Sequence, residues 1–290
     1  MPYIRAFHGK TLVIRFGGNA MADPALKAGF ARDVALLRLV GMKPIVVHGA
    51  GWRIDQLMEQ MGQPSRRYHG VRITDEPTLT IVEMALSEAN QELTSLINQH
   101  GGRAVGLDGQ DGRFIHARKM APPADDADAP DLGFVGDVES IDTGLIDLLL
   151  SRDFVPVIMP IGAAADGTTY HINSDLLAGR LARALEAEKL ILMTNVAGVH
   201  DRDGNLAYVL TASDADKMLH DNVVHGGMVP RVVAALRAVR EGVRSVHIID
   251  GGVPSALLLE VLTAEGVGTA VRSDDGAHFF DDSKAYLLAK

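Results

Sequence analysis

Three arginines and one aspartate near glycine-rich turns are the residues of this sequence best suited to chemistry: Arg15, Arg72, Asp175 and Arg231. Arg15 leads directly into Gly17–Gly18, where the lack of a Cβ lets backbone N–H groups point at an anion. Guanidinium groups beside such turns neutralise charge. The set therefore suits two mutually repelling anions held in contact, such as a carboxylate and a nucleotide phosphate, and needs no nucleophilic side chain.

Each of these residues also has an ordinary structural explanation. Residues 12–21 are equally consistent with a strand-to-helix turn that carries a surface arginine. Arg72 would be a solvated loop arginine, and Ser174 and Asp175 would be helix caps. The residues by themselves leave these alternatives open.

Glycine-containing turns follow three apolar runs, and these runs must position the candidate residues. Residues 12–16 lead into Gly17–Gly18, residues 43–48 into Gly49–Gly51, and residues 189–196 into Gly198. Apolar runs followed by helical spacing are typical of parallel strand–helix units, whose strands end at one edge of the sheet. The sequence therefore predicts a ligand site at that edge.

The predicted elements alternate along the whole chain. Strands are expected at residues 12–16, 43–48, 102–107, 154–160, 189–196 and 246–252, the last being the final clear strand, and helices at 24–40, 54–61, 78–99, 145–150, 175–185 and from 225–231 onward. Counting the alternations gives about eight strands. This predicts an α/β protein, an open, largely parallel eight-stranded αβα sandwich, with a seam between two lobes near Asp166.

Composition excludes several classes of protein. The 290 residues carry a net charge of −9 and no cysteine, which disfavours a nucleic-acid surface and removes disulfides, thiolate metal sites and cysteine nucleophiles. No apolar run approaches the roughly 20 residues of a membrane span, so we expect a soluble cytoplasmic protein. The Pro- and Asp-rich loop 121–131 and the tail 273–290 receive no role.

Two common nucleotide-binding motifs are missing from the sequence. No G-x-G-x-x-G follows the first strand, and no G-x-x-x-x-G-K-[ST] occurs. An NAD-linked oxidoreductase on a doubly wound sheet therefore loses its main support.

Nine motifs in order resemble those of N-acetylglutamate kinases, members of the amino acid kinase family: residues 16–21, 46–51, 70–75, 104–107, 133–138, 172–175, 194–198, 227–231 and 246–251. They extend from about residue 11 to residue 270. The resemblance implies ATP-dependent phosphorylation of the side-chain carboxylate of N-acetyl-L-glutamate or a related acylamino acid, giving an acyl phosphate, as in arginine biosynthesis.

The resemblance also implies that two lobes of the chain bind different ligands. Residues 1–165 would form an N-terminal lobe for acylamino acid binding and dimerisation, and residues 166–290 a nucleotide-binding lobe on the same sheet. The implied catalytic residues are Arg15, Gly18, Asp175 and Arg231; the substrate-binding residues are Gly49, Ala50, Gly51, Arg72, His171 and Asn173; the nucleotide-binding residues are Gly17, Asn195, Val196, Gly198, Val199, Gly226, Gly227 and Met228. Mg²⁺ would be held mainly by the nucleotide phosphates, with no metal site in the protein.

Five departures from the family pattern cluster on the implied site. Arg15 and Arg231 replace lysines, Ala50 a glycine, His171 an asparagine and Asn195 an aspartate. Arginine keeps the charge but is longer, planar and forked. One hypothesis is a working acylamino acid kinase, possibly with a shifted substrate. The other is a catalytically altered paralogue that acts as a ligand-binding or regulatory protein, or a related transferase.

Assembly is also predicted from the resemblance. About ten residues precede the first expected strand, too few for the N-terminal helix of the family's arginine-inhibited hexamers. We therefore expect a homodimer without arginine feedback.

Overall fold

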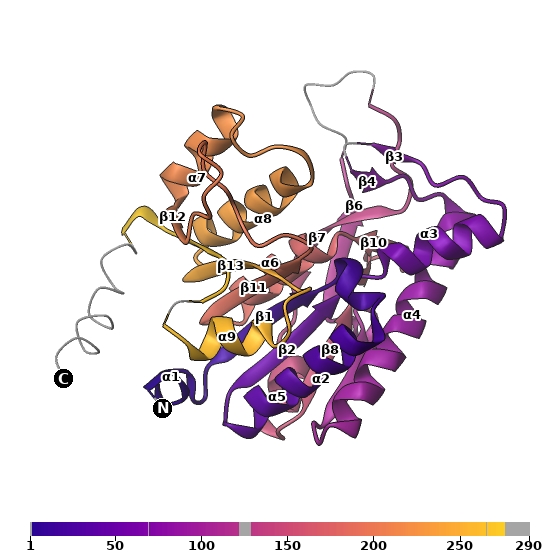
Figure 1. Ribbon diagram of the computed structural model, residues 1–290. Helices are drawn as coiled ribbons and strands as arrows, with labels where there is room; N and C mark the ends of the chain where they lie inside the picture. The colour runs from indigo at the N-terminus through magenta and orange to yellow at the C-terminus, as the bar shows by residue number, and fades with distance from the viewer. Residues whose placement is uncertain (1, 69, 122–128, 265, 276–290) are drawn as a thin grey trace, which may run out of the picture.

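An eight-stranded, largely parallel sheet is the framework of the computed structural model, which describes residues 2–68, 70–121, 129–264 and 266–275 (Figure 1). The strand order is β12-β14-β13-β11-β1-β2-β8-β5, and the β13–β14 pair is antiparallel. The strands are β1 (Thr11–Phe16), β2 (Lys43–His48), β5 (Ala104–Asp108), β8 (Val155–Met159), β11 (Lys189–Thr194), β12 (Val209–Thr211), β13 (Ser245–Asp250) and β14 (Thr269–Arg272).

Helices cover both faces of this sheet. One apolar core holds side chains from α2 (Pro24–Leu39), α3 (Gly51–Gln60), α4 (Glu76–Gln99) and α9 (Ala256–Leu262), and the other from α5 (Gly144–Ser151), α6 (Ser174–Ala184), α7 (Ala212–His220) and α8 (Val229–Arg240). Within β1, Leu12 and Ile14 enter the first core and Val13 the second, as the two-residue period of a strand requires. The predicted αβα sandwich is confirmed.

A second, smaller sheet and a hairpin were not predicted. The strands β6 (Ile115–Lys119), β7 (Val135–Ile141), β9 (Ile161–Ala163) and β10 (Thr169–Ile172) close into a barrel, and β3 (Arg67–Tyr68) pairs with β4 (Val71–Arg72). These strands are short or polar, so they lack the apolar runs by which strands were recognised. Arg72 accordingly lies in a strand and is buried, so the expectation of a loop at this segment is wrong.

The ends of the chain also differ from expectation. Six of the residues before β1 form a helix, α1 (Pro2–Phe7), which was not expected, and β13 is followed by a further strand, β14. Most of the predicted loop 121–131 and of the tail 273–290 lies outside the described residues. Among the helices of the described ranges, none combines the length and apolar character needed to cross a membrane.

Candidate active site

Three adjacent parallel strands bring the candidate residues to one edge of the sheet. β11, β1 and β2 are neighbours, so their carboxyl ends lie side by side. β1 leads into a 3-10 turn, η1 (Gly18–Met21), and β2 leads into α3 through Gly49, whose amide donates to the Phe16 carbonyl at 3.0 Å. The predicted meeting of the glycine turns of β1 and β2 is confirmed.

Arg15 links this edge to the first turn of α6. Its Nε lies 2.7 Å from Asp175 Oδ1 and 3.2 Å from Ser174 Oγ, and its Nη1 donates to the Met193 carbonyl at 3.1 Å. Arg15 and Asp175 are both mostly buried, with side-chain exposures of 12% and 13%. The surface-arginine alternative is therefore wrong for Arg15.

Gly17 and Gly18 leave room for two side chains. A Cβ on Gly17 would lie 2.6 Å from Arg15 Nη1, and one on Gly18, whose φ is +73°, would lie 2.3 Å from Asn195 Oδ1. The same Asn195 oxygen accepts from the Asn19 amide at 2.8 Å. Asn195 thus ties the end of β11 to the turn after β1.

Arg231 belongs to the same charged cluster. It lies at the start of α8, just after the 3-10 turn η3 (Gly226–Met228), and its Nη1 donates to the Gly227 carbonyl. Burial lowers the pKa of Arg231; nearby Asp175 opposes this effect and Arg15 adds to it. Within the described part of the chain its Nε is buried without a hydrogen-bond partner. Arg231 and Arg15 thus place two positive charges near Asp175 at this edge of the sheet.

The first turn of α6 is capped by Asn173. Its Oδ1 accepts from the amides of Asp175 at 2.9 Å and Leu176 at 3.1 Å. The cap explanation for Ser174 and Asp175 is therefore wrong, because both side chains face Arg15 instead. Ser174 was missed as a site residue, and its position beside Asp175 is the only hint in the sequence.

A cavity of about 130 Å³ opens next to this cluster. Its walls include Arg15 and all six predicted substrate-binding residues, together with Arg67, Ser174 and apolar side chains such as Ile54 and Leu86. Ala50 offers no side-chain cap to α3, and a Cβ on Gly51 would meet open space. The backbone N–H groups at the start of α3 therefore suit an anion in this cavity.

Arg72 is also part of the cavity wall. Its side chain is 3% exposed and donates to Asp55 Oδ1 at 2.7 Å and to Ser65 Oγ at 2.6 Å. Asp55 Oδ2 also accepts from Arg67 at 3.1 Å. Asp55, Ser65 and Arg67 were missed as site residues; the basic pair at 66–67, shortly before Arg72, was the available sign.

Two histidines at the site are neutral near pH 7. Desolvation is the largest cause that lowers the pKa of His171 to about 4, and Arg72 and Arg67 add to it. His48 is fully buried at the end of β2, and burial lowers its pKa to about 4; its contact with the Gly49 carbonyl opposes this and Arg15 adds to it. Both rings therefore act here as neutral hydrogen-bonding groups.

Ala50, one of the five departures, and the nearby Trp52, also unusual for the family, have different surroundings. The Ala50 side chain is 2% exposed and packs in the apolar core, so its extra methyl is largely accommodated there. Trp52 is 37% exposed and is not among the described residues that line the cavity.

The predicted nucleotide-binding loop after β11 is only partly accessible. Val196 is exposed, but Val199 is buried and its amide donates to Thr269 Oγ1 at 2.8 Å. A Cβ on Gly198 would lie 2.5 Å from the same hydroxyl. Val199 therefore anchors the loop to the protein interior. Gly226, Gly227 and Met228 lie directly before the helix that carries Arg231.

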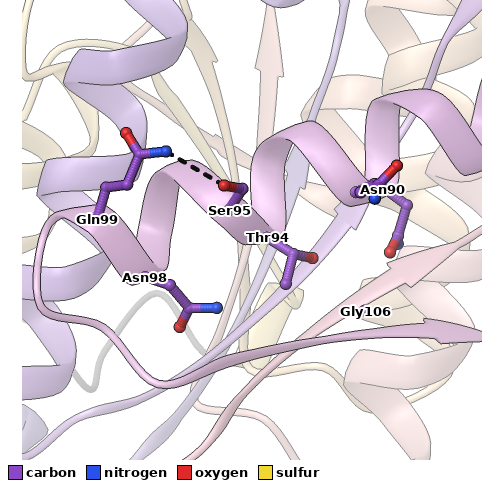
Figure 2. A pocket seen from close by; sticks show the side chains of 7 residues that line it. Asn90, Thr94, Ser95, Asn98, Gln99 and Gly106 are labelled. Atoms are coloured by element: carbon purple, nitrogen blue, oxygen red, sulfur yellow. Dashed lines mark hydrogen bonds between the residues drawn. The ribbon is translucent and has the colours of Figure 1, made fainter.

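A larger hollow of about 700 Å³ lies elsewhere, between α4 and the edge strand β5 (Figure 2). It is lined by uncharged residues: Asn90, Gln91, Thr94, Ser95, Asn98, Gln99 and Gly106. Without a cation this hollow does not suit the anions considered above. Asn90 connects it to the site, because its Nδ2 lies 3.1 Å from His48 Nε2. No group of three or more His, Asp or Glu side chains suited to a metal ion occurs among the residues described by the structure.

Comparison with known proteins identifies the family. Residues 10–250 match the Amino acid kinase family. The chain belongs to the amino acid kinase family. It is 54% identical over 274 residues to the acetylglutamate kinase of Chromobacterium violaceum, covering 94% of this chain and 95% of that one. It is 54% identical over 278 residues to the acetylglutamate kinase of Nitrosomonas eutropha, with 94% of each chain covered.

Solved structures of the amino acid kinase type agree. The N-acetylglutamate synthase of Neisseria gonorrhoeae in complex with coenzyme A and N-acetyl-glutamate superimposes with a TM-score of 0.82 at 26% identity, over 94% of this chain and 62% of that chain. A carbamate kinase from Giardia lamblia bound to AMP-PNP shares the fold, with a TM-score of 0.66 at 16% identity over 92% of this chain and 99% of that one. The family and fold predicted from the motifs are confirmed.

Proposed function

We propose that this chain uses ATP to phosphorylate the side-chain carboxylate of N-acetyl-L-glutamate or a related acylamino acid, giving an acyl phosphate in arginine biosynthesis. The observation that carries the proposal is the charge distribution of one cavity. Arg15 lies at one part of its wall, in a cluster with Asp175 and Arg231, and the buried Arg72 lies at another. Two acidic groups of one acceptor would therefore meet two separate cations.

The residues support the transfer by neutralising and positioning. ATP, with Mg²⁺ held mainly by its phosphates, would supply the phosphoryl group. Arg72 would bind the α-carboxylate, and Gly18 and the amides of residues 49–51 would donate to the transferring phosphoryl. Arg15 and Arg231 would lower the repulsion between the two anions; Asp175 pairs with Arg15 and attracts the nearby Arg231.

The atoms balance without a nucleophilic side chain. A side-chain carboxylate oxygen of the acceptor forms a bond to the γ-phosphorus, and the bond from that phosphorus to the bridging oxygen breaks, with its electron pair leaving on ADP. The charged donors near the developing charge are arginine N–H groups, at positions where the motifs lead one to expect lysine. A forked guanidinium can hold two oxygens at once.

One observation favours the second candidate, a paralogue that binds its ligands without turnover. Arg15 already contacts Asp175, Ser174 and the Met193 carbonyl, so part of its capacity for hydrogen bonds is used within the protein. Fewer N–H groups of Arg15 would then be available to the reacting oxygens.

An assay of ADP release with ATP and N-acetyl-L-glutamate tests the proposal. We expect turnover by the wild-type chain, compared with Arg15→Lys/Arg231→Lys and with Arg244→Lys, a control at an exposed arginine that pairs with Glu188. If neither the wild type nor the double variant releases ADP while calorimetry detects nucleotide binding, the kinase proposal is wrong and the binding paralogue is favoured.

The finer expectations from the sequence belong to the same proposal. Residues 1–165 would bind the acylamino acid and form a homodimer, residues 166–290 would bind the nucleotide, and the protein would act in the cytoplasm. Light scattering of the purified chain tests the assembly, and a hexamer or a monomer would contradict it.

A further inference from the structure

The hairpin β3–β4 places two arginines opposite each other. Arg67 of β3 and Arg72 of β4 are direct partners in the antiparallel register, so their side chains leave the same face of the hairpin. Like charges in directly opposite positions destabilise a strand pair. Such a pair needs either a compensating group or an anionic ligand.

A single carboxylate compensates both arginines. Asp55 accepts from Arg72 at 2.7 Å through Oδ1 and from Arg67 at 3.1 Å through Oδ2. The three groups together keep a net charge of +1. Both arginines line the acceptor cavity, whereas Asp55 is not among its described lining residues. The remaining positive charge therefore faces the cavity.

His171 is a neutral neighbour of the two arginines. It lines the same cavity, and both Arg72 and Arg67 disfavour its protonated form. The ring is neutral and adds no third cation. The two guanidinium groups consequently act on one region of the cavity wall.

We propose that Arg67 is a second acceptor-binding residue, which shares with Arg72 the α-carboxylate of an acylamino dicarboxylic acid. Asp55 is the positioning residue that holds the two arginines together in the free protein. The inference rests on the proposed function for the class of ligand. Beyond that function, the inference states that two arginines, and not Arg72 alone, bind the α-carboxylate.

Calorimetric titration with two ligands tests the inference. The ligands are N-acetyl-L-glutamate and its α-carboxamide, which keeps the side-chain carboxylate. The proteins are the wild type, Arg67→Gln and a control, Arg66→Gln, at the exposed neighbouring arginine. We expect Arg67→Gln to weaken binding of N-acetyl-L-glutamate about 10- to 100-fold, since a hydrogen bond between charged partners is lost. Binding of the α-carboxamide should change less than about threefold, because its α-group carries no charge.

Three other outcomes would overturn the inference. An equal loss of affinity for both ligands would show that Arg67 only supports the hairpin. Unchanged affinity for both ligands, or no binding of N-acetyl-L-glutamate by the wild type, would also contradict it. If Arg67→Gln does not fold, Arg67→Lys replaces it in the same titration. Because lysine keeps the charge, this variant should still bind N-acetyl-L-glutamate more tightly than the α-carboxamide, but by a smaller factor than the wild type. Binding that prefers N-acetyl-L-glutamate to its α-carboxamide through Arg67, without ADP release, would contradict the kinase proposal but support this inference.

Discussion

At the scale of single residues, the site depends on how closely arginine side chains approach bare backbone. The Arg15 guanidinium occupies space that any side chain at Gly17 would take, and it reaches three groups from two other elements. A shorter lysine at this position could not make the same set of contacts. The arginine at this position is therefore integrated into the fold as well as the site.

Removal of the Arg15 charge should affect chemistry more than acceptor binding. We expect Arg15→Ala to reduce kcat about 10²- to 10³-fold, the usual effect of losing one donor to transition-state charge, with a smaller change in KM for N-acetyl-L-glutamate. Steady-state kinetics measure both. Arg244→Ala, at an exposed arginine that pairs with Glu188, should leave both constants near wild type; an unchanged kcat in Arg15→Ala would contradict its catalytic role.

A methyl group on Gly18 should be harmful for two separable reasons. Gly18→Ala places a side chain at a φ of +73° and 2.3 Å from Asn195 Oδ1. The backbone strain alone costs about 1–3 kcal/mol in the free energy of unfolding. Gly62→Ala is the matched control, because Gly62 has a φ of +67° with open space around its Cβ position. Urea unfolding should show a larger loss for Gly18→Ala, and equal losses would mean that Asn195 moves aside freely.

At the scale of elements, the alternation of strands and helices followed from apolar runs and helical spacing. The helix predicted at 24–40 is α2, and that at 78–99 is α4, each beginning with an aspartate cap and a proline in the first turn. The barrel strands β6, β7, β9 and β10 escaped prediction because their buried side chains are few and join the two cores only once distant segments pair. Their amphipathic character is too weak over three to seven residues to stand out.

The cap of α6 connects helix stability to the site, and a second cap provides the control. Asn173→Ala and Asp23→Ala each remove a side chain that accepts from two amides at a helix start, in α6 and α2 respectively. Each should lower the free energy of unfolding by about 1 kcal/mol. Only Asn173→Ala should also lower ADP release, since Ser174 and Asp175 follow this cap and contact Arg15. Equal activity of the two variants would contradict this link.

At the scale of the whole molecule, ionisable groups are buried at both ends of the central strands. His48 lies beside the site, while His247 of β13 contacts Glu260 Oε1 at 2.5 Å and Lys189 Nζ at 3.1 Å. Burial is the largest cause that lowers the pKa of His247 to about 4, and Lys189 adds to it while Glu260 opposes it. Folding therefore opposes protonation of histidines in two separate regions.

Acid should destabilise the protein through these histidines. The unfolded chain binds protons near pH 6.5, whereas folded His48 and His247 bind them near pH 4, so stability falls as the pH drops between these values. Each histidine contributes up to about 1.4 kcal/mol per pH unit. Asp33, whose pKa burial raises to about 6, acts in the opposite direction. Urea unfolding at pH 7 and pH 5 should show the net loss.

A double variant measures the contribution of His48 and His247 to this pH dependence. His48→Gln/His247→Gln removes two of the three histidines whose pKa is lowered to about 4, and leaves His171 and Asp33 in place. Its free energy of unfolding should fall less between pH 7 and pH 5 than that of the wild type. An unchanged slope would show that other groups govern acid stability.

The sequence by itself determined the family, through nine motifs in order, and the αβα sandwich, through apolar periodicity and glycine turns, which are local properties of the chain. The same turns and motifs indicated the charged residues of the candidate site. Arg15, Asp175, Arg72 and the loop 49–51 were all recognised this way. Only the tertiary structure decided that Ser174 supports Arg15, that Val199 is buried behind its loop and that Asp55 joins Arg67 to Arg72. These contacts depend on which elements the sheet and the hairpin bring together, and pairing between distant segments is not encoded in the spacing of any one of them.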